Sequence, residues 1–148
     1  RHRGMYPHRR RGKPLARPRH QNPMIQKHPV KIAIKNLRLR TIIGINEWER
    51  ETKQDVIINV ELELVPGTIF ARDAIDETVD YKQLNRRITA EVEQSSFFLV
   101  EKLCDHLLTL VMEDARVERA RIEVAKPAAL RFTDSVSVEC SAERVGVE

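Results

Sequence analysis

The feature that most constrains the fold is an alternation of apolar and mostly polar residues over the stretch 56–64. The apolar series occupies every second position: Val56, Ile58, Val60, Leu62 and Leu64. A period of two is typical of a strand with one face in a hydrophobic core and the other in water. An extended run, Lys31 to Ile43, comes before it. The two runs predict a pair of strands that are neighbours in the chain.

The segment between these runs, residues 44–54, is longer than the two to five residues that join ordinary hairpins. It contains Gly44, which can adopt positive φ, the only tryptophan, Trp48, and three glutamates. A long loop on a short scaffold is more often functional than idle. We therefore predict that Glu49 is a catalytic carboxylate. The alternative is a solvated charge without a role.

Two helices are expected next. Asp80 stands where an N-cap would, with Gln83 three residues later as in a capping box. Apolar residues at helical spacing follow as far as Val92, and a second helix with a wide apolar face is expected over about 99–115.

Two more alternating stretches, 118–125 and 135–140, predict strands, so the element order is ββααββ. The simplest architecture is an α+β fold in which both helices cover one face of a four-stranded antiparallel sheet. Such a sheet has two open edges, which a ring of subunits would pair. We place the folded domain at 30–142 and a C-terminal tail at 143–148.

The net charge of +4 conceals two regions of opposite character. Residues 1–28 hold nine of the 26 Lys and Arg and none of the 22 Asp and Glu. Residues 1–29 are rich in Arg, His and Pro, so we expect a disordered basic tail. It could bind nucleic acid or acidic lipid, or be sequence upstream of a start at Met24. The rest is mildly acidic, which argues against nucleic-acid binding by the folded domain.

The sequence favours a cytoplasmic protein that does not enter membranes. No apolar run approaches the roughly 20 residues of a membrane helix, and the tail lacks the apolar core of a secretory signal. Cys104 and Cys140 fall within apolar patterns. We interpret them as small buried thiols in a reducing compartment, with a disulfide or metal site as the alternative.

Three other residues could carry chemistry, although each has an ordinary explanation. Lys126 precedes Pro127, which favours extended backbone, but a lysine at a strand end is usually a surface residue. Tyr81 at a helix start would ordinarily pack against the core. Glu101, in the first turn of the second helix, would complement the helix dipole. No single position justifies a functional claim.

Together with their neighbours, these residues resemble the dihydroneopterin aldolase family. The motifs occur in the family's order: Gly44-Ile45-x-x-Trp48-Glu49 with Gln54, Thr78-Val79-Asp80-Tyr81, Leu99-Val100-Glu101-Lys102-Leu103 and Val124-x-Lys126-Pro127. The likeness covers about residues 30–142. Segments 34–41 and 129–137 are more similar to the dihydroneopterin triphosphate 2′-epimerase branch than to the folate-pathway aldolase.

The resemblance implies a tunnelling fold, in which several subunits close their sheets into a barrel, commonly as a homo-octamer of two tetrameric rings. It implies a pterin site between subunits, with no cofactor and no metal. Glu101 would bind the pterin amino group and ring N–H with its two carboxylate oxygens, beside Leu99 and Val100. The neighbouring subunit would contribute three residues: Thr78, Val79 and Tyr81.

The resemblance further implies that Glu49 and Lys126 face the trihydroxypropyl side chain of the substrate. Lys126 would be the base for the 2′-hydroxyl, Glu49 would hold the side chain or a water, and Tyr81 would relay protons; base and relay could be exchanged. Arg131 is the first candidate for binding the triphosphate. Four further cations are either triphosphate contacts or sheet-edge charges: Lys35, Arg38, Arg40 and Arg121.

Other functions stay open at this point. Zinc-dependent enzymes of the tunnelling fold need several His ligands, but four of the five histidines lie in the tail and His106 falls within a helix, which argues against that branch. A simple dihydroneopterin aldolase is the nearest alternative. A protein without enzymatic activity, which forms a ring or binds through its basic tail, is another.

Overall fold

The computed structural model describes residues 24–146; most of the expected basic tail, residues 1–23, lies outside them. Eight elements follow one another: β1 (Lys31–Thr41), α1 (Glu47–Glu51), β2 (Gln54–Leu64), η1 (Ile75–Glu77), α2 (Tyr81–Gln94), α3 (Val100–Met112), β3 (Val117–Pro127) and β4 (Ser135–Glu143). The four strands pair in the order β1-β2-β3-β4, and every pair is antiparallel.

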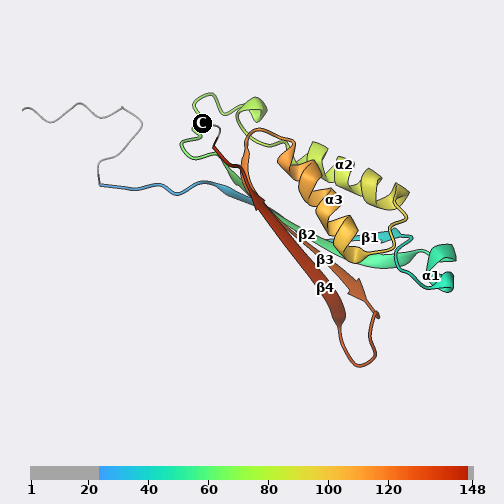
Figure 1. Ribbon diagram of the computed structural model, residues 1–148. Coiled ribbons are helices and arrows are strands. Elements are labelled where there is room, and N and C mark those ends of the chain that lie inside the picture. The colour runs from blue at the N-terminus through green and yellow to red at the C-terminus, as the bar shows by residue number, and fades with distance from the viewer. Residues whose placement is uncertain (1–23, 147–148) are drawn as a thin grey trace, which may run out of the picture.

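The molecule has two layers, because α2 and α3 lie on the same face of the sheet (Figure 1). Helix α2 packs against β1, and α3 packs against β3 and β4. The predicted α+β architecture is confirmed. None of the described helices is both long and apolar enough to cross a membrane.

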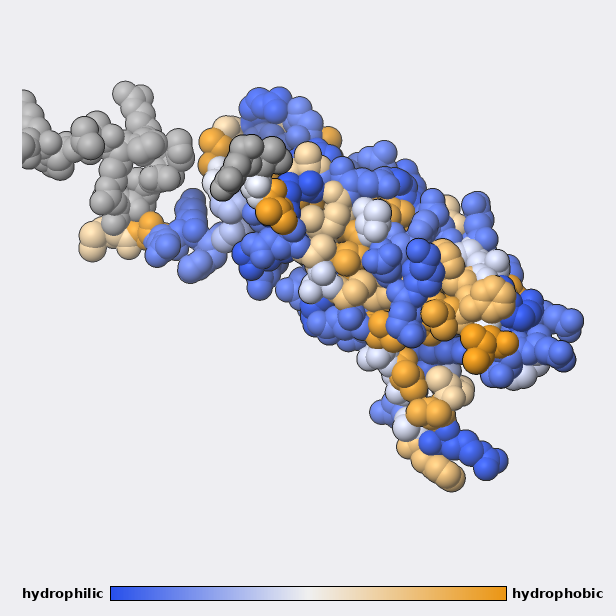
Figure 2. All heavy atoms as spheres, viewed as in Figure 1, coloured by the Kyte–Doolittle hydropathy of each residue, from blue (hydrophilic) through white to orange (hydrophobic). Residues whose placement is uncertain are grey.

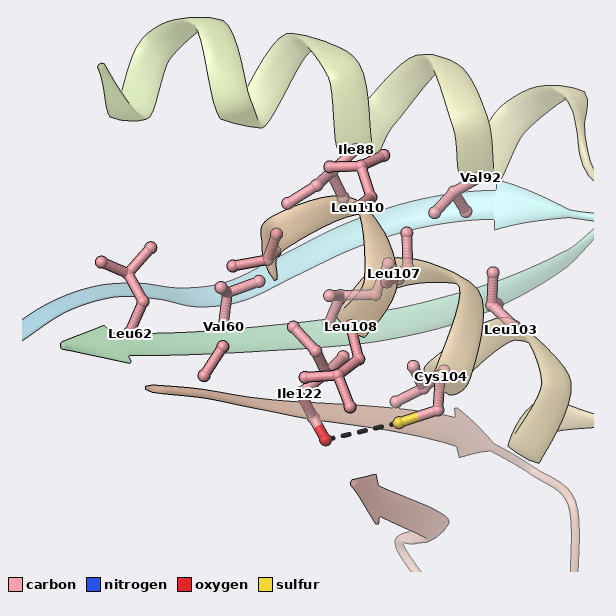
Figure 3. Packing of buried hydrophobic residues seen from close by; sticks show 14 of the residues in the cluster. Val60, Leu62, Ile88, Val92, Leu103, Cys104, Leu107, Leu108, Leu110 and Ile122 are labelled. Carbon is pink, nitrogen blue, oxygen red and sulfur yellow. Dashed lines mark hydrogen bonds between the residues drawn. The ribbon is translucent and has the colours of Figure 1, made fainter. Parts of the chain in front are cut away.

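The core lies between these layers and is built by the periodicities of strand and helix. The apolar series of β2 faces the helices, and all five of its members are buried. Ile88 and Val92 of α2 and Leu103 and Leu107 of α3 are fully buried opposite them (Figure 3). Burial of such aliphatic side chains stabilises the fold by about 1.5–3 kcal/mol each.

A bulge keeps the apolar side chains of β1 on one face. The register with β2 shifts between Ile34 and Leu37, and Asn36 there has a positive φ of 54°. The side chain of Asn59 in β2 accepts a hydrogen bond from the Asn36 amide at 2.9 Å. Without this extra residue Leu37 would point away from the core, because a shift of one position turns every later side chain over.

Helices α2 and α3 begin close to the expected positions, whereas the end of α3 differs from the expected one. Asp80 caps α2, since its carboxylate accepts from the amides of Lys82 and Gln83 at 3.1 and 3.2 Å. Helix α3 ends at Met112, earlier than expected. A turn follows in which Asp114 accepts hydrogen bonds from the backbone and side chain of Arg116.

The face of the sheet opposite the helices is polar. Its charges pair across strands: Arg121 contacts Glu139 at 3.0 Å and Glu61 at 3.2 Å. Arg119 contacts Glu63 and Glu143 at 2.9 and 3.0 Å. Exposed pairs of this kind add little stability, but they keep this face hydrophilic.

The two cysteines are free thiols that meet between α3 and β4. Cys104 is fully buried, Cys140 is partly buried, and their sulfurs lie 3.0 Å apart. Burial, followed by the contact with Cys140, raises the pKa of Cys104 to about 12. Cys104 therefore behaves as a packing residue.

Candidate active site

Glu49 is the centre of the candidate site, and the long connection between β1 and β2 holds it in place. Residues 47–51 of that connection form the short helix α1, which sequence periodicity could not reveal in five residues. Asn46 at its N-cap donates from its backbone amide and from its side chain to Glu49 Oε1, at 3.3 and 2.8 Å. The Glu49 side chain is therefore fixed by its own helix start.

The other carboxylate oxygen of Glu49 reaches two donors from β2 and β3. Gln54 Nε2 donates to Glu49 Oε2 at 2.9 Å and to the Ile43 carbonyl at 2.7 Å. Lys126 Nζ forms an ion pair with the same oxygen. Glu49 is only 4% exposed, and the Lys126 side chain 13%. The structure thus brings together the two predicted catalytic residues that are farthest apart in sequence.

The surroundings of Glu49 keep it ionised. Burial alone would raise its pKa, but the hydrogen bonds from Lys126, Gln54 and Asn46 together outweigh burial and lower the pKa to about 2. At neutral pH the group is a carboxylate with four donors on its two oxygens. It cannot serve as a proton donor there, and it is well suited to hold a cation.

Gly44 allows the backbone to pass directly over this carboxylate. Its φ is +127°, and a Cβ at this position would overlap Cδ and both oxygens of Glu49. Only glycine combines that backbone conformation with that close approach.

Arg50 ties this loop to the connector between α2 and α3, residues 95–99. Its guanidinium donates to the carbonyls of Gly44 and Phe97, each at 3.0 Å, and to the carbonyl of Ser96, and it lies 3.9 Å from the centre of the Phe98 ring. The amide of Gly44 also donates to the Phe97 carbonyl at 3.2 Å. Sequence reasoning missed Arg50, because its partners are backbone carbonyls, two of them more than forty positions away, and backbone groups leave no residue pattern.

The connector leads into the predicted pterin-binding residues at the start of α3. Leu99 occupies the N-cap position and is half-exposed, and Val100 packs against the core. The side chain of Glu101 is exposed and has no hydrogen bond or ion pair within residues 24–146. The start of α3 therefore presents an unpaired carboxylate a few residues from the segment that Arg50 holds.

Thr78, Val79 and Tyr81 lie at the opposite end of the helical layer (Figure 1). The 14 residues of α2, roughly 20 Å of helix, separate Tyr81 from the connector. Val79 is buried in the core, so only its backbone could face a ligand, whereas Tyr81 is 54% exposed. One chain by itself does not bring Tyr81 to Glu49.

The five candidate cations differ in whether they are already paired. Arg38 and Arg40 both contact Asp55, at 3.0 and 2.9 Å, and Arg121 is held by Glu61 and Glu139. Arg131, in the connection between β3 and β4, and Lys35 are exposed, and neither has a partner among the described residues. These two are the cations left for an anionic ligand.

The described residues contain no group of three or more His, Cys, Asp or Glu side chains arranged to hold a metal ion. His106 pairs with Glu91 at 2.9 Å and stands 5.4 Å from the Phe97 ring, centre to centre. It is the polar-face residue that its helical position predicts.

Comparison with known proteins identifies relatives along most of the chain. Residues 32–141 match the family model described as dihydroneopterin aldolase. A Pseudomonas aeruginosa protein named dihydroneopterin triphosphate 2′-epimerase is 38% identical over 122 residues, 82% of this chain and 99% of the relative. The Escherichia coli protein of the same name is 39% identical over 113 residues, 76% of this chain and 94% of the relative.

A solved structure supports the fold. The crystal structure of Escherichia coli dihydroneopterin aldolase in complex with neopterin superposes with a TM-score of 0.71, covering 76% of this chain and 98% of that one. Its sequence is 22% identical, so the likeness concerns the fold alone.

Proposed function

The chain belongs to the dihydroneopterin aldolase family, and we propose that within it this protein is a dihydroneopterin triphosphate 2′-epimerase. It would convert 7,8-dihydroneopterin triphosphate into 7,8-dihydromonapterin triphosphate in the cytoplasm. The relatives that carry this name match nearly their whole length. The observation that carries the chemistry is the buried ion pair of Glu49 and Lys126.

The reaction we propose is a retro-aldol cleavage followed by re-addition. Removal of the proton from the 2′-hydroxyl lets C2′ become an aldehyde as the C1′–C2′ bond breaks. The bond's electrons move to C1′=C6, and N5 of the former N5=C6 imine takes up a proton. The substrate thus supplies its own electron acceptor, and the enzyme must move two protons.

Lys126 is the residue we assign to the 2′-hydroxyl proton: the ammonium of the ion pair gives up one proton, which is passed on towards N5, and the resulting amine takes the proton of the hydroxyl. Its amine is partly withdrawn from water and is held from one side by Glu49. Since all the hydrogen-bonded donors around Glu49 are in place and its pKa is about 2, Glu49 orients Lys126 and the substrate without taking the proton itself. Tyr81 of a neighbouring copy would relay protons as hydroxyl donor and acceptor.

Glu101 is the residue we assign to the pterin ring. Two adjacent N–H groups on the ring match the two oxygens of one carboxylate, and Glu101 has no partner among the described residues that would compete. Leu99 and Val100 would form the wall beside the ring. The backbone of Thr78 and Val79 would contact it from the neighbouring copy.

Epimerisation differs from aldol cleavage in what happens to the aldehyde fragment. If the fragment stays, turns its other face to C1′ and is recaptured, N5 loses its proton, the 2′-oxygen regains one, and C2′ is inverted. A triphosphate held by a cation would delay release, and Arg131 is our first choice for that cation. Release of the fragment, followed by protonation of C1′ and loss of the proton from N5, would instead give 6-hydroxymethyl-7,8-dihydropterin, the aldolase reaction, which is the alternative function.

The site as we propose it takes residues from more than one copy of the chain. Tyr81 lies at the far end of α2 from Glu49, so a second copy must supply it if it acts there. The sheet also has two open edges, β1 and β4. Hydrophobic side chains remain exposed near α1 and along the β3–β4 connection, among them Trp48, Phe98, Leu130 and Phe132 (Figure 2). These features support a homo-octamer of two tetrameric rings with sites between subunits.

Incubation with 7,8-dihydroneopterin triphosphate, followed by oxidation and chromatography of the pterins, tests this function. Appearance of the C2′-inverted triphosphate supports it. Recovery of unchanged substrate would contradict it and would favour the alternative of a protein that binds without enzymatic activity.

A further inference from the structure

Arg50 follows Glu49 in α1, but its side chain takes no part in the hydrogen bonds around Glu49. Its guanidinium donates to the carbonyls of Gly44, Phe97 and Ser96 and stacks on Phe98. We propose that Arg50 is a positioning residue, which sets the place of the start of α3 relative to the Glu49–Lys126 pair. The inference rests on the function proposed above.

Few contacts join the two segments whose relative position matters. Apart from Arg50, the hydrogen bonds between the β1 end with its following loop and the connector are those of Gly44 with Phe97 and of Thr41 with Ser95. Arg50 alone reaches three carbonyls on both segments. A rigid guanidinium fork fixes distance and angle together, which a single hydrogen bond cannot do.

The connector leads directly into the first turn of α3, which carries Glu101. Phe97 stands four residues before Glu101, and α3 begins between them at Val100. Glu49, in contrast, is held by Asn46 and Gln54, and neither of them is hydrogen-bonded to the Arg50 side chain. Loss of Arg50 would therefore leave the ion pair and the pterin anchor each intact but shift one against the other.

This separation predicts a particular kinetic effect. The pterin ring would still bind through Glu101, so KM should change little. The C1′–C2′ bond would lie off its productive position, and a misplacement of about 1 Å can cost about 10²-fold in rate.

Arg144 provides a matched control, because it makes the same kind of contact elsewhere. Its guanidinium donates to the carbonyls of Val117 at 3.1 Å, Met112 at 2.7 Å and Asp114 at 3.2 Å. These carbonyls lie at the end of α3, in the turn after it and at the start of β3, away from Glu49 and Glu101. Arg144→Met therefore removes a guanidinium from three carbonyls without touching Glu49, Lys126, Glu101 or the connector.

The experiment compares Arg50→Met, Arg50→Lys and Arg144→Met with the unaltered chain by kcat and KM for 7,8-dihydroneopterin triphosphate and by melting temperature. For Arg50→Met we expect kcat to fall about 10²-fold with KM within about threefold. Arg144→Met should lower the melting temperature about as much as Arg50→Met does, and it should keep kcat within about twofold of the unaltered chain. Arg50→Lys, which keeps the charge but not the fork, should recover part of kcat.

Four results would overturn the inference. One is a kcat for Arg50→Met within twofold of the unaltered chain, and another is an equal loss of kcat in Arg144→Met at equal stability. If Arg50→Met does not fold, Arg50→Lys decides: a reduced kcat at an unchanged melting temperature supports the inference, and an unchanged kcat overturns it. An unaltered chain that turns over no pterin would overturn the proposed function itself, and the inference with it.

Discussion

Lys126 and Glu49 stand 77 positions apart in the chain and form a buried ion pair. The pairing is possible because β3 lies next to β2, whose start follows the loop that carries Glu49. Glu49 accepts four hydrogen bonds and is ionised, so Lys126 is the member of the pair that can exchange a proton with a substrate.

Replacing Lys126 should abolish turnover without abolishing pterin binding. In Lys126→Ala we expect both cleavage and epimerisation to fall by about 10³-fold or more, because the general base is lost. Affinity for neopterin, which Glu101 would dominate, should stay within about threefold. Fluorescence titration measures the affinity, and turnover assays measure the rate. Turnover near that of the unaltered chain would contradict the mechanism.

A double variant separates this loss from a loss of stability. Lys126→Ala leaves a buried carboxylate unpaired, which costs about 3–5 kcal/mol. Lys126→Met with Glu49→Gln replaces the pair by neutral groups of similar size, so stability should return towards that of the unaltered chain while activity does not. Recovery of activity in the double variant would exclude the proposed roles.

The free energy of unfolding should depend on pH in the way that the lowered pKa of Glu49 predicts. Its pKa is lowered from 4.5 to about 2 in the folded chain, so the unfolded chain binds this proton first as the pH falls. The stabilisation, about 3 kcal/mol, is complete above about pH 4.5 and is lost as the pH approaches 2. Urea unfolding between pH 6 and pH 3 measures how the free energy of unfolding falls over this range. Glu49→Gln should flatten this dependence, whereas Glu101→Gln should keep it; an unchanged dependence in Glu49→Gln contradicts the account.

Two glycines with positive φ should respond differently to alanine. Gly67 has a φ of +81° with nothing within 4 Å of an added Cβ, so Gly67→Ala should cost about 1–2 kcal/mol of backbone strain. Gly44→Ala adds an overlap with the Glu49 carboxylate, so it should cost about 3 kcal/mol or more and also lower kcat. Equal losses of stability in the two variants, with normal turnover, would show that the close approach at Gly44 is not required.

A site shared between two copies can be tested by complementation. Tyr81→Phe and Lys126→Ala should each be nearly inactive, yet coexpressed chains should assemble some sites with both native residues. If the two residues come from different copies and the chains mix at random, about one quarter of the sites are intact. Activity in the mixture no higher than in the better single variant would mean that both residues come from one chain.

The fold was largely predictable because its elements have clear periods. The β2 alternation, the Asp80 cap and the apolar stripe of α3 each stand within one short segment. The bulge at Asn36 was not predictable in the same way, since it depends on the Asn59 side chain in the next strand.

The site was predictable only through residues that resemble a family motif. Glu49, Lys126 and Glu101 were named in that way, although each has an ordinary role when taken alone. The hydrogen bonds of Arg50 join backbone carbonyls, and backbone groups are identical at every residue. No pattern of side chains could therefore have identified its partners.

The most direct test of the central claim is the distribution of products from two substrates. The chain is incubated with 7,8-dihydroneopterin triphosphate and, separately, with its dephosphorylated form, and the oxidised pterins are resolved as neopterin, monapterin and 6-hydroxymethylpterin. The account predicts monapterin triphosphate as the main product of the triphosphate, with little 6-hydroxymethylpterin. Predominant 6-hydroxymethylpterin from both substrates would contradict it and assign the chain to the aldolase reaction.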